Sequence, residues 1–282
     1  MSVARDYAVL DEPQAGLQRL AARFQGHAYD PHRHETYAIG ITERGVQSFR
    51  YRGAERASLS GQIIVIHPDE PHDGHAGLPS GFAYRMLYLD PALVQRALGA
   101  FGPPPFVADV VAEDAETAGI LAEAFTDFPA ALDPLAVDGI VVRLADALAR
   151  RGDRAGRAAR GSHAAARVEA VRSFLVAECG REITSAELEA VAGLDRFTLA
   201  REFRAVLGTS PHRYLVGRRL DLARTLIMSG TDLAEAAVAA GFVDQSHLTR
   251  HFKTRYGLTP GRWAALARAD PHATRGRARP RA

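Results

Sequence analysis

The sequence predicts an α+β protein of more than one domain, with a β-barrel or β-sandwich in the N-terminal half and an all-α C-terminal half. The 282 residues are about twice the length of a common domain. Short apolar runs alternate with turn residues up to about residue 90, whereas apolar residues recur at helical spacing from about Asp114. The last third of the chain contains an internal repeat at an offset of 49 residues.

The composition excludes several classes of protein. Hydrophobic residues make up 47% of the chain and charged residues 24%, which is typical of a globular protein and excludes extensive disorder. The single cysteine, Cys179, cannot form an internal disulfide, so a reducing cytoplasm is the expected location. No stretch approaches the roughly 18 apolar residues of a membrane helix, and the N-terminus lacks a signal-peptide core. We therefore expect neither secretion nor a membrane partner.

Charge is divided unevenly along the chain. Residues 1–162 contain 16 arginines and 21 acidic residues, a net charge of −5, whereas residues 163–282 contain 19 basic and 12 acidic residues, a net charge of +7. A basic half favours a polyanionic partner. The alternative is a general preference for arginine, because Lys253 is the only lysine and the terminal RGRARPRA adds to the total.

Four strands are predicted in the N-terminal half. Turn residues separate them at Glu43–Gly45, Ser60-Gly61 and Leu78–Gly81. The predicted strands are Tyr37–Thr42, Val46–Arg52, Gln62–Ile66 and Phe82–Leu89. Short strands at this spacing are typical of a barrel or a sandwich.

Two helices are expected between residues 114 and 149, interrupted near Phe128-Pro129 and Asp133-Pro134. The stretch that follows, RRGDRAGRAARGS, has no bulky apolar residue and is rich in Gly and Arg. We therefore predict a first domain over residues 1–149 that ends in a helical segment, and a linker over 150–163. A second domain over 164–270 and a basic, disordered tail over 271–282 complete the chain.

The second domain contains a duplicated helix-turn-helix unit. Six positions recur at the offset of 49 residues, which composition alone does not explain. The recurring pairs are Leu199 and Leu248, Arg201 and Arg250, Phe203 and Phe252, Gly208 and Gly257, Pro211 and Pro260, and Tyr214 and Trp263. Thr184 with Glu187, and Asp232 with Glu235, are capping-box signatures that open the first helix of each unit.

A short helix, a glycine-containing turn and a second helix that begins with polar and basic residues can place that second helix in the major groove of DNA. Arginine pairs with guanine edges and glutamine with adenine edges, so double-stranded DNA is the predicted partner. A pair of ordinary αα-hairpins is the alternative. The residues predicted to face DNA are Arg196, Phe197, Arg201, Gln245, Ser246, Thr249 and Arg250.

The run from Ala236 to Trp263 resembles the signature of the AraC/XylS family of bacterial transcription regulators. It contains GF, then S-x-L-x-R-x-F-K, then G-x-x-P in the family's order. Arg218-Arg219 and the apolar residues after them are similar to the family's long helix between two helix-turn-helix units. Two positions depart from the family pattern, Asp195 where Ser is common and His247 where Phe or Tyr is common.

This resemblance covers about residues 165–268 and implies a sequence-specific regulator of transcription. Its implied partners are promoter or operator DNA, RNA polymerase and a small-molecule effector. A homodimer is implied as well, because a helix near residues 135–148 often forms the family's dimer contact. The alternative for that helix is that its apolar stripe only covers the barrel.

The N-terminal half resembles the two motifs of a cupin barrel, which is the effector domain of many AraC-type regulators. The first motif is G-x5-H-x-H at residues 26–34, and the second is G-x5-H-P-D-x-P-H at residues 61–72. The resemblance implies a cupin-like β-barrel with a helical extension. In metal-binding cupins the ligands are two histidines of the first motif, a later glutamate and a histidine of the second motif.

Carried over position by position, these ligands are His32, His34 and His72, but Ala38 and Ile39 occupy the glutamate positions. His32 and His34 are two residues apart near a strand, so their rings project to one face. Glu35 would then point to the opposite face unless an irregular strand turned it inward.

We therefore predict an effector cavity with no metal, no cofactor and no catalytic residue. The predicted effector-binding residues are His32, His34, Tyr37 and His72, whereas His67 and His75 are expected in turns or at the surface. Tyr84 and Tyr88 fit either a pocket or ordinary core packing. The alternative function is a metal-dependent cupin enzyme fused to a DNA-binding domain.

Overall fold

The computed structural model describes residues 6–99, 103–152 and 162–269. Within these ranges no helix is both long and apolar enough to cross a membrane. The tail predicted over 271–282 and residues 153–161 of the predicted linker lie outside the described residues. At both ends of that linker the chain is helical, because one helix continues to Arg151 and the next begins at Ser162.

The N-terminal domain is an antiparallel β-structure in two layers. One layer has the strand order β1-β2-β8-β4-β6-β9, and the second joins β3, β7, β4 and β5. The strands are β1 (Tyr7–Gln14), β2 (Leu17–Phe24), β3 (His27–His32), β4 (Tyr37–Tyr51), β5 (Ala54–Leu59), β6 (Ile63–Ile66), β7 (His72–Ala76), β8 (Phe82–Leu89) and β9 (Val111–Ala112). The predicted barrel-like, strand-rich domain is confirmed. Two of the four predicted strands are parts of β4, the other two are β6 and β8, and six further strands of the described residues were not predicted.

Strand β4 connects the two layers, and the turn predicted at Glu43–Gly45 is wrong. A register shift between Thr42 and Arg44 bends the strand without ending it. Residues 37–45 pair with β8 and β6, whereas residues 46–51 pair with β5 and β7. Gly45 has φ +74, and a Cβ there would lie 2.0 Å from the Gly81 carbonyl oxygen, so only glycine permits this bend.

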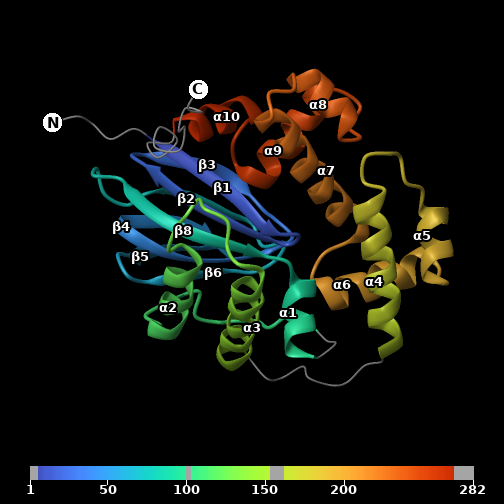
Figure 1. The fold of residues 1–282 in the computed structure, drawn as a ribbon, viewed down its shortest axis with the longest axis horizontal. Helices are drawn as coiled ribbons and strands as arrows, with labels where there is room; N and C mark the ends of the chain where they lie inside the picture. The colour runs from blue at the N-terminus through green and yellow to red at the C-terminus, as the bar shows by residue number, and fades with distance from the viewer. Residues whose placement is uncertain (1–5, 100–102, 153–161, 270–282) are drawn as a thin grey trace, which may run out of the picture.

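The first layer buries both of its faces, which explains its nearly continuous apolar strands. On β4 and β6, Tyr37, Ile39, Ile63 and Val65 pack outward against helices, whereas Ala38 faces the interior. The covering helices are α1 (Pro91–Leu98), α2 (Ala115–Ala124) and α3 (Pro134–Arg151), with α2 and α3 lying below the sheet in Figure 1. The two helices predicted between residues 114 and 149 are therefore confirmed.

The C-terminal domain consists of helices, and its duplication is confirmed. The helices are α4 (Ser162–Ala177), α5 (Ser185–Ala192), α6 (Arg196–Leu207), α7 (Pro211–Met228), α8 (Leu233–Ala239), α9 (Gln245–Tyr256) and α10 (Pro260–Arg268). Helices α6 and α9 are each 12 residues long. Asp195 and Asp244 cap their N-termini, and Gly208 and Gly257 end them in the left-handed conformation. The capping box at Thr184 is also present.

The two helix-turn-helix units pack against different surroundings. In the first, Leu199 and Phe203 belong to a helical core shared with α4. In the second, Leu248, Phe252 and Trp263 belong to a core that continues into the barrel interior. Figure 1 shows the consequence, with α9 and α10 lying over the strands while α5 and α6 lie to the side.

Candidate functional site

A cavity lies between the two β-layers, and the C-terminal domain forms part of its wall. The barrel contributes polar groups and aromatic rings as well as aliphatic side chains. Among its lining residues are His32, His34, Gln47, His72, Tyr84 and Tyr88 from the barrel and Arg255, Tyr256, Leu258 and Trp263 from the C-terminal domain. The cavity is therefore shared by both domains, which the sequence did not predict.

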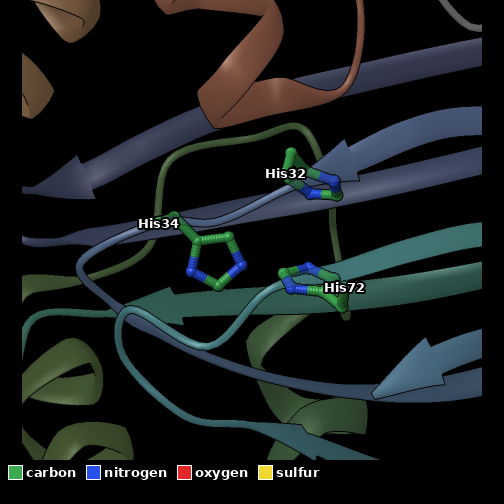
Figure 2. Close-up of side chains that lie close together, drawn as sticks. All are labelled: His32, His34 and His72. Atoms are coloured by element: carbon green, nitrogen blue, oxygen red, sulfur yellow. The ribbon is translucent and has the colours of Figure 1, made fainter. Parts of the chain in front are cut away.

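The structure brings His32, His34 and His72 together in this cavity. His32 ends β3, His34 follows in the loop, and His72 begins β7, so their rings gather around one space (Figure 2). All three side chains are buried, and one ring nitrogen of each lies within 4.8 Å of the others. The ring centroids are 4.2 Å apart for His32 and His72 and 4.9 Å apart for His34 and His72.

Each of these histidines has its Nδ1 atom next to a backbone carbonyl oxygen. The distances are 3.0 Å from His32 to Asp30, 2.9 Å from His34 to Thr36 and 3.0 Å from His72 to Glu70. A carbonyl oxygen only accepts, so each Nδ1 carries the proton and each Nε2 presents a lone pair.

Burial keeps these rings neutral. It is the largest cause that lowers the pKa of His32 and of His34 well below 6.5, with the neighbouring rings and Arg255 adding to the shift. Burial also lowers the pKa of His72 to about 4. At neutral pH the cavity therefore contains three uncharged imidazoles.

Tyr37 was predicted to contact the effector, and the structure corrects this. Its side chain points to the helix-covered face of the first layer, and its hydroxyl donates to the Pro105 carbonyl oxygen at 2.6 Å. The cause is strand alternation, because Tyr37 and the cavity-lining Ala38 are neighbours on β4. Tyr84 and Tyr88 of β8 line the cavity instead.

His67 was predicted in a turn or at the surface and is in fact buried. Its Nδ1 lies 2.7 Å from the Tyr51 hydroxyl, and its Nε2 accepts from the Val107 backbone amide at 2.8 Å. Both ring nitrogens are therefore used in joining strands to the segment before α2. This histidine has a structural role and does not line the cavity.

Glu35 lies in the bend between β3 and β4, turns away from the three histidines and contacts the C-terminal domain. Its carboxylate forms an ion pair with Arg255 at the end of α9, and the side chains are 11% and 5% exposed. A Cβ on Gly217 of α7 would lie 2.6 Å from Glu35 Oε1, so glycine makes room for the carboxylate there. Asp221 lies 3.5 Å from the same guanidinium.

Backbone hydrogen bonds also dock α9 on the barrel. The Asp30 amide donates to the Gly257 carbonyl oxygen and the Arg33 amide to the Thr254 carbonyl oxygen, each at 3.0 Å. Lys253 Nζ lies 2.7 Å from Asp30 Oδ2. We call these three contacts, together with the Glu35–Arg255 ion pair, the α9 dock.

The first unit has its own contacts with the N-terminal domain. The Tyr214 hydroxyl of α7 donates to Asp90 Oδ2, the N-cap of α1, at 3.0 Å in a buried setting. Gln95 of α1 donates to the Val206 carbonyl oxygen at the end of α6. Both units thus contact the N-terminal domain at the C-terminal ends of α6 and α9, and the first unit also does so through α7.

The predicted DNA-facing residues lie on the outer surface of α6 and α9. Arg196, Phe197, Arg201, Gln245, Ser246 and Arg250 are exposed, and Thr249 is half-buried. Phe197 is 64% exposed although it is a large apolar side chain. The apolar residues Leu199, Phe203, Leu248 and Phe252 are buried, so both helices have the division of faces that the sequence predicts.

Arg218 and Arg219 on α7 are used within the protein. Arg218 pairs with Asp221 at 3.0 Å and is largely buried. Arg219 donates to the carbonyl oxygens of Cys179 and Arg181, after the end of α4. Both side chains therefore support α7 and its contact with the end of α4.

Arg255 and Tyr256 line the cavity and were not predicted to do so. A signal was present in the repeat, because the equivalent positions of the first unit are Val206 and Leu207. The first unit has two apolar residues at these positions, whereas the second unit has two residues with polar groups. This difference indicates that the ends of α6 and α9 contact different surroundings.

Two family models match the chain. The AraC-like ligand binding domain matches residues 14–163, and a helix-turn-helix domain matches residues 188–265. The chain belongs to the AraC family of transcription regulators. The first match covers the β-domain with its helical extension, and the second covers both units of the duplication.

Relatives of this AraC-family chain agree with the assignment. An uncharacterized HTH-type transcriptional regulator, YbfI of Bacillus subtilis, is 24% identical over 233 residues, which are 81% of this chain and 85% of YbfI. The transcriptional activator RhrA of Rhizobium meliloti is 38% identical over 84 residues, 28% of this chain and 27% of RhrA. ToxT from Vibrio cholerae has a similar two-domain fold, with a TM-score of 0.64, 11% identity and coverage of 89% of this chain and 98% of ToxT.

Proposed function

We propose that this regulator binds a small molecule in the shared cavity and thereby changes how α9 is presented to DNA. One observation carries the proposal: a single helix exposes Gln245 and Arg250 at the molecular surface and supplies Arg255 and Tyr256 to the cavity wall. A ligand that fits the cavity better in one position of α9 shifts the population toward that position. By linkage, DNA and effector then change each other's affinity by the same factor.

Several finer features belong to the same proposal. The chain acts as a regulator without enzymatic turnover, works with RNA polymerase, and functions in the cytoplasm because its target is DNA.

We also propose a homodimer through α3. Two large apolar side chains of this helix are exposed, Leu135 to 81% and Val142 to 45%. Sedimentation of the purified chain distinguishes a dimer from a monomer.

Selection from a pool of random duplex DNA tests the DNA-binding part of the proposal. We expect one asymmetric site with two major-groove segments about 10 base pairs apart, since two different recognition helices are joined within one chain. Failure to enrich any sequence would contradict the proposal. Footprinting of the selected site that shows protection of only one groove segment would contradict it as well.

Arg201→Ala and Gln245→Ala are each expected to weaken binding to the selected site by about 1–3 kcal/mol, because each removes a base-edge contact. Binding to random DNA should change much less. Arg56→Ala, which removes an exposed positive charge from β5, is the matched control and should leave both affinities nearly unchanged. Equal losses on selected and random DNA would make Arg201 a phosphate contact instead of a base contact.

A further inference from the structure

The three cavity histidines have a feature that a purely organic effector site does not require. Each Nδ1 donates to a carbonyl oxygen within two residues of its own position, at 2.9 to 3.0 Å. Each Nε2 is thereby left as an acceptor. Metal-binding histidines are typically fixed in this way, since the outer hydrogen bond sets the tautomer and orients the ring.

The three imidazole rings lie close together in a buried place. One nitrogen from each ring lies within 4.8 Å of the others, against about 3.3 Å between ligands of a tetrahedral zinc ion. His34 Nε2 is buried and has no hydrogen-bond partner among the described residues. Three neutral imidazoles that converge on one buried space can bind a cation through their nitrogen lone pairs.

We propose that His32, His34 and His72 bind a divalent transition-metal ion such as Zn²⁺ or Fe²⁺ through their Nε2 atoms. Three imidazoles suit these borderline ions and suit Mg²⁺ or Ca²⁺ poorly. The set differs from the four-ligand cupin pattern, because Ala38 stands at a glutamate position and Glu35 is paired with Arg255. The ion is therefore held by neutral protein ligands only, with open coordination positions toward the cavity.

The open positions give the ion a role in effector recognition, and this part rests on the proposed function. The same cavity contains the Gln47 amide, the Tyr88 ring and, on its C-terminal wall, Arg255. An effector with an anionic oxygen would complete the coordination of the ion and offset its charge. Metal binding itself does not depend on DNA binding.

Metal titration of the full chain tests the site. After dialysis against EDTA, we expect the protein to take up one equivalent of Zn²⁺ and, separately, one of Co²⁺, which absorbs visible light in a site with protein nitrogen ligands. His34→Ala and His72→Ala should each weaken binding by at least about 100-fold, because each removes a ligand and loss of an outer hydrogen-bond partner alone costs about 10- to 100-fold. His75→Ala is the matched control, because His75 lies on β7 with His72 but outside the cluster, and it should bind like wild type.

A readout on the unchanged chain covers the case in which a variant fails to fold. Nitrogen-15 spectra of the imidazoles should show Zn²⁺ shifting the Nε2 signals of three histidines. Uptake below about one fifth of an equivalent for both ions would overturn the proposal. A loss of metal affinity in His75→Ala as large as that in His34→Ala or His72→Ala would overturn it too. The DNA selection above is carried out on the metal-free chain, so its failure is distinguishable from failure of the metal site.

Discussion

Arg255→Met is expected to lower the free energy of unfolding of the docked chain by about 3–5 kcal/mol. The substitution leaves the buried Glu35 carboxylate without its cation, and removing one partner of a buried ion pair costs this much. This loss cannot exceed the free energy of docking between the second unit and the barrel. If the loss were larger, the second unit would leave the barrel and water would reach Glu35. Urea unfolding measures the loss, and small-angle scattering measures the expected increase in radius of gyration.

A second substitution separates the ion pair from other effects of losing the arginine. Glu35→Leu combined with Arg255→Met replaces both charges by apolar groups and should recover most of the stability. Arg250→Met, at an exposed position of the same helix, should change stability by no more than about 0.5 kcal/mol. Persistence of the full loss in the double variant would show that Glu35 is not the reason for it.

Gly257→Ala is expected to disrupt the α9 dock, whereas Gly208→Ala is not. The two glycines end equivalent helices with φ values of +66 and +75, so both substitutions carry the same left-handed strain of about 1–2 kcal/mol. A Cβ at Gly257 would lie 2.5 Å from Tyr29 Cβ and 2.6 Å from the Asp30 carbonyl oxygen. At Gly208 the nearest atom would be Pro68 Cβ, at an ordinary contact distance of 3.4 Å.

The added cost at Gly257 is about 1–3 kcal/mol, which is typical of inserting a carbon atom into a packed interface. Urea unfolding of the two variants side by side measures it, with the internal repeat providing the control. Equal losses of stability in Gly257→Ala and Gly208→Ala would show that the barrel is not tightly packed against the end of α9.

Patterns within one element were predictable from the sequence. The offset of 49 residues, the capping residues and the glycine stops indicated both helix-turn-helix units, because these signals depend on local backbone chemistry. The buried and exposed faces of α6 and α9 followed from helical periodicity. Among candidate site residues, His32, His34 and His72 were found through the cupin resemblance rather than through periodicity.

Features that depend on distant packing were not predictable. Tyr37 and Ala38 are adjacent in an apolar strand, and only the cover of helices on one face decides which of them reaches the cavity. His67 follows an apolar strand as a turn residue would, yet its ring nitrogens bond to Tyr51 and Val107. The Glu35–Arg255 pair joins positions 220 residues apart, and no local pattern relates them.

The α9 dock gives the most direct test of the central claim, that barrel and DNA-binding surface are coupled through one helix. The Asp30 and Arg33 amides donate to α9 and to the residue after it, so their hydrogen exchange reports docking from the barrel side. We predict that binding of the selected DNA changes both exchange rates at least tenfold, about 1.4 kcal/mol of coupling, although neither amide lies on the DNA-facing surface. Exchange rates at Asp30 and Arg33 that stay within twofold while α6 and α9 become protected would contradict the account.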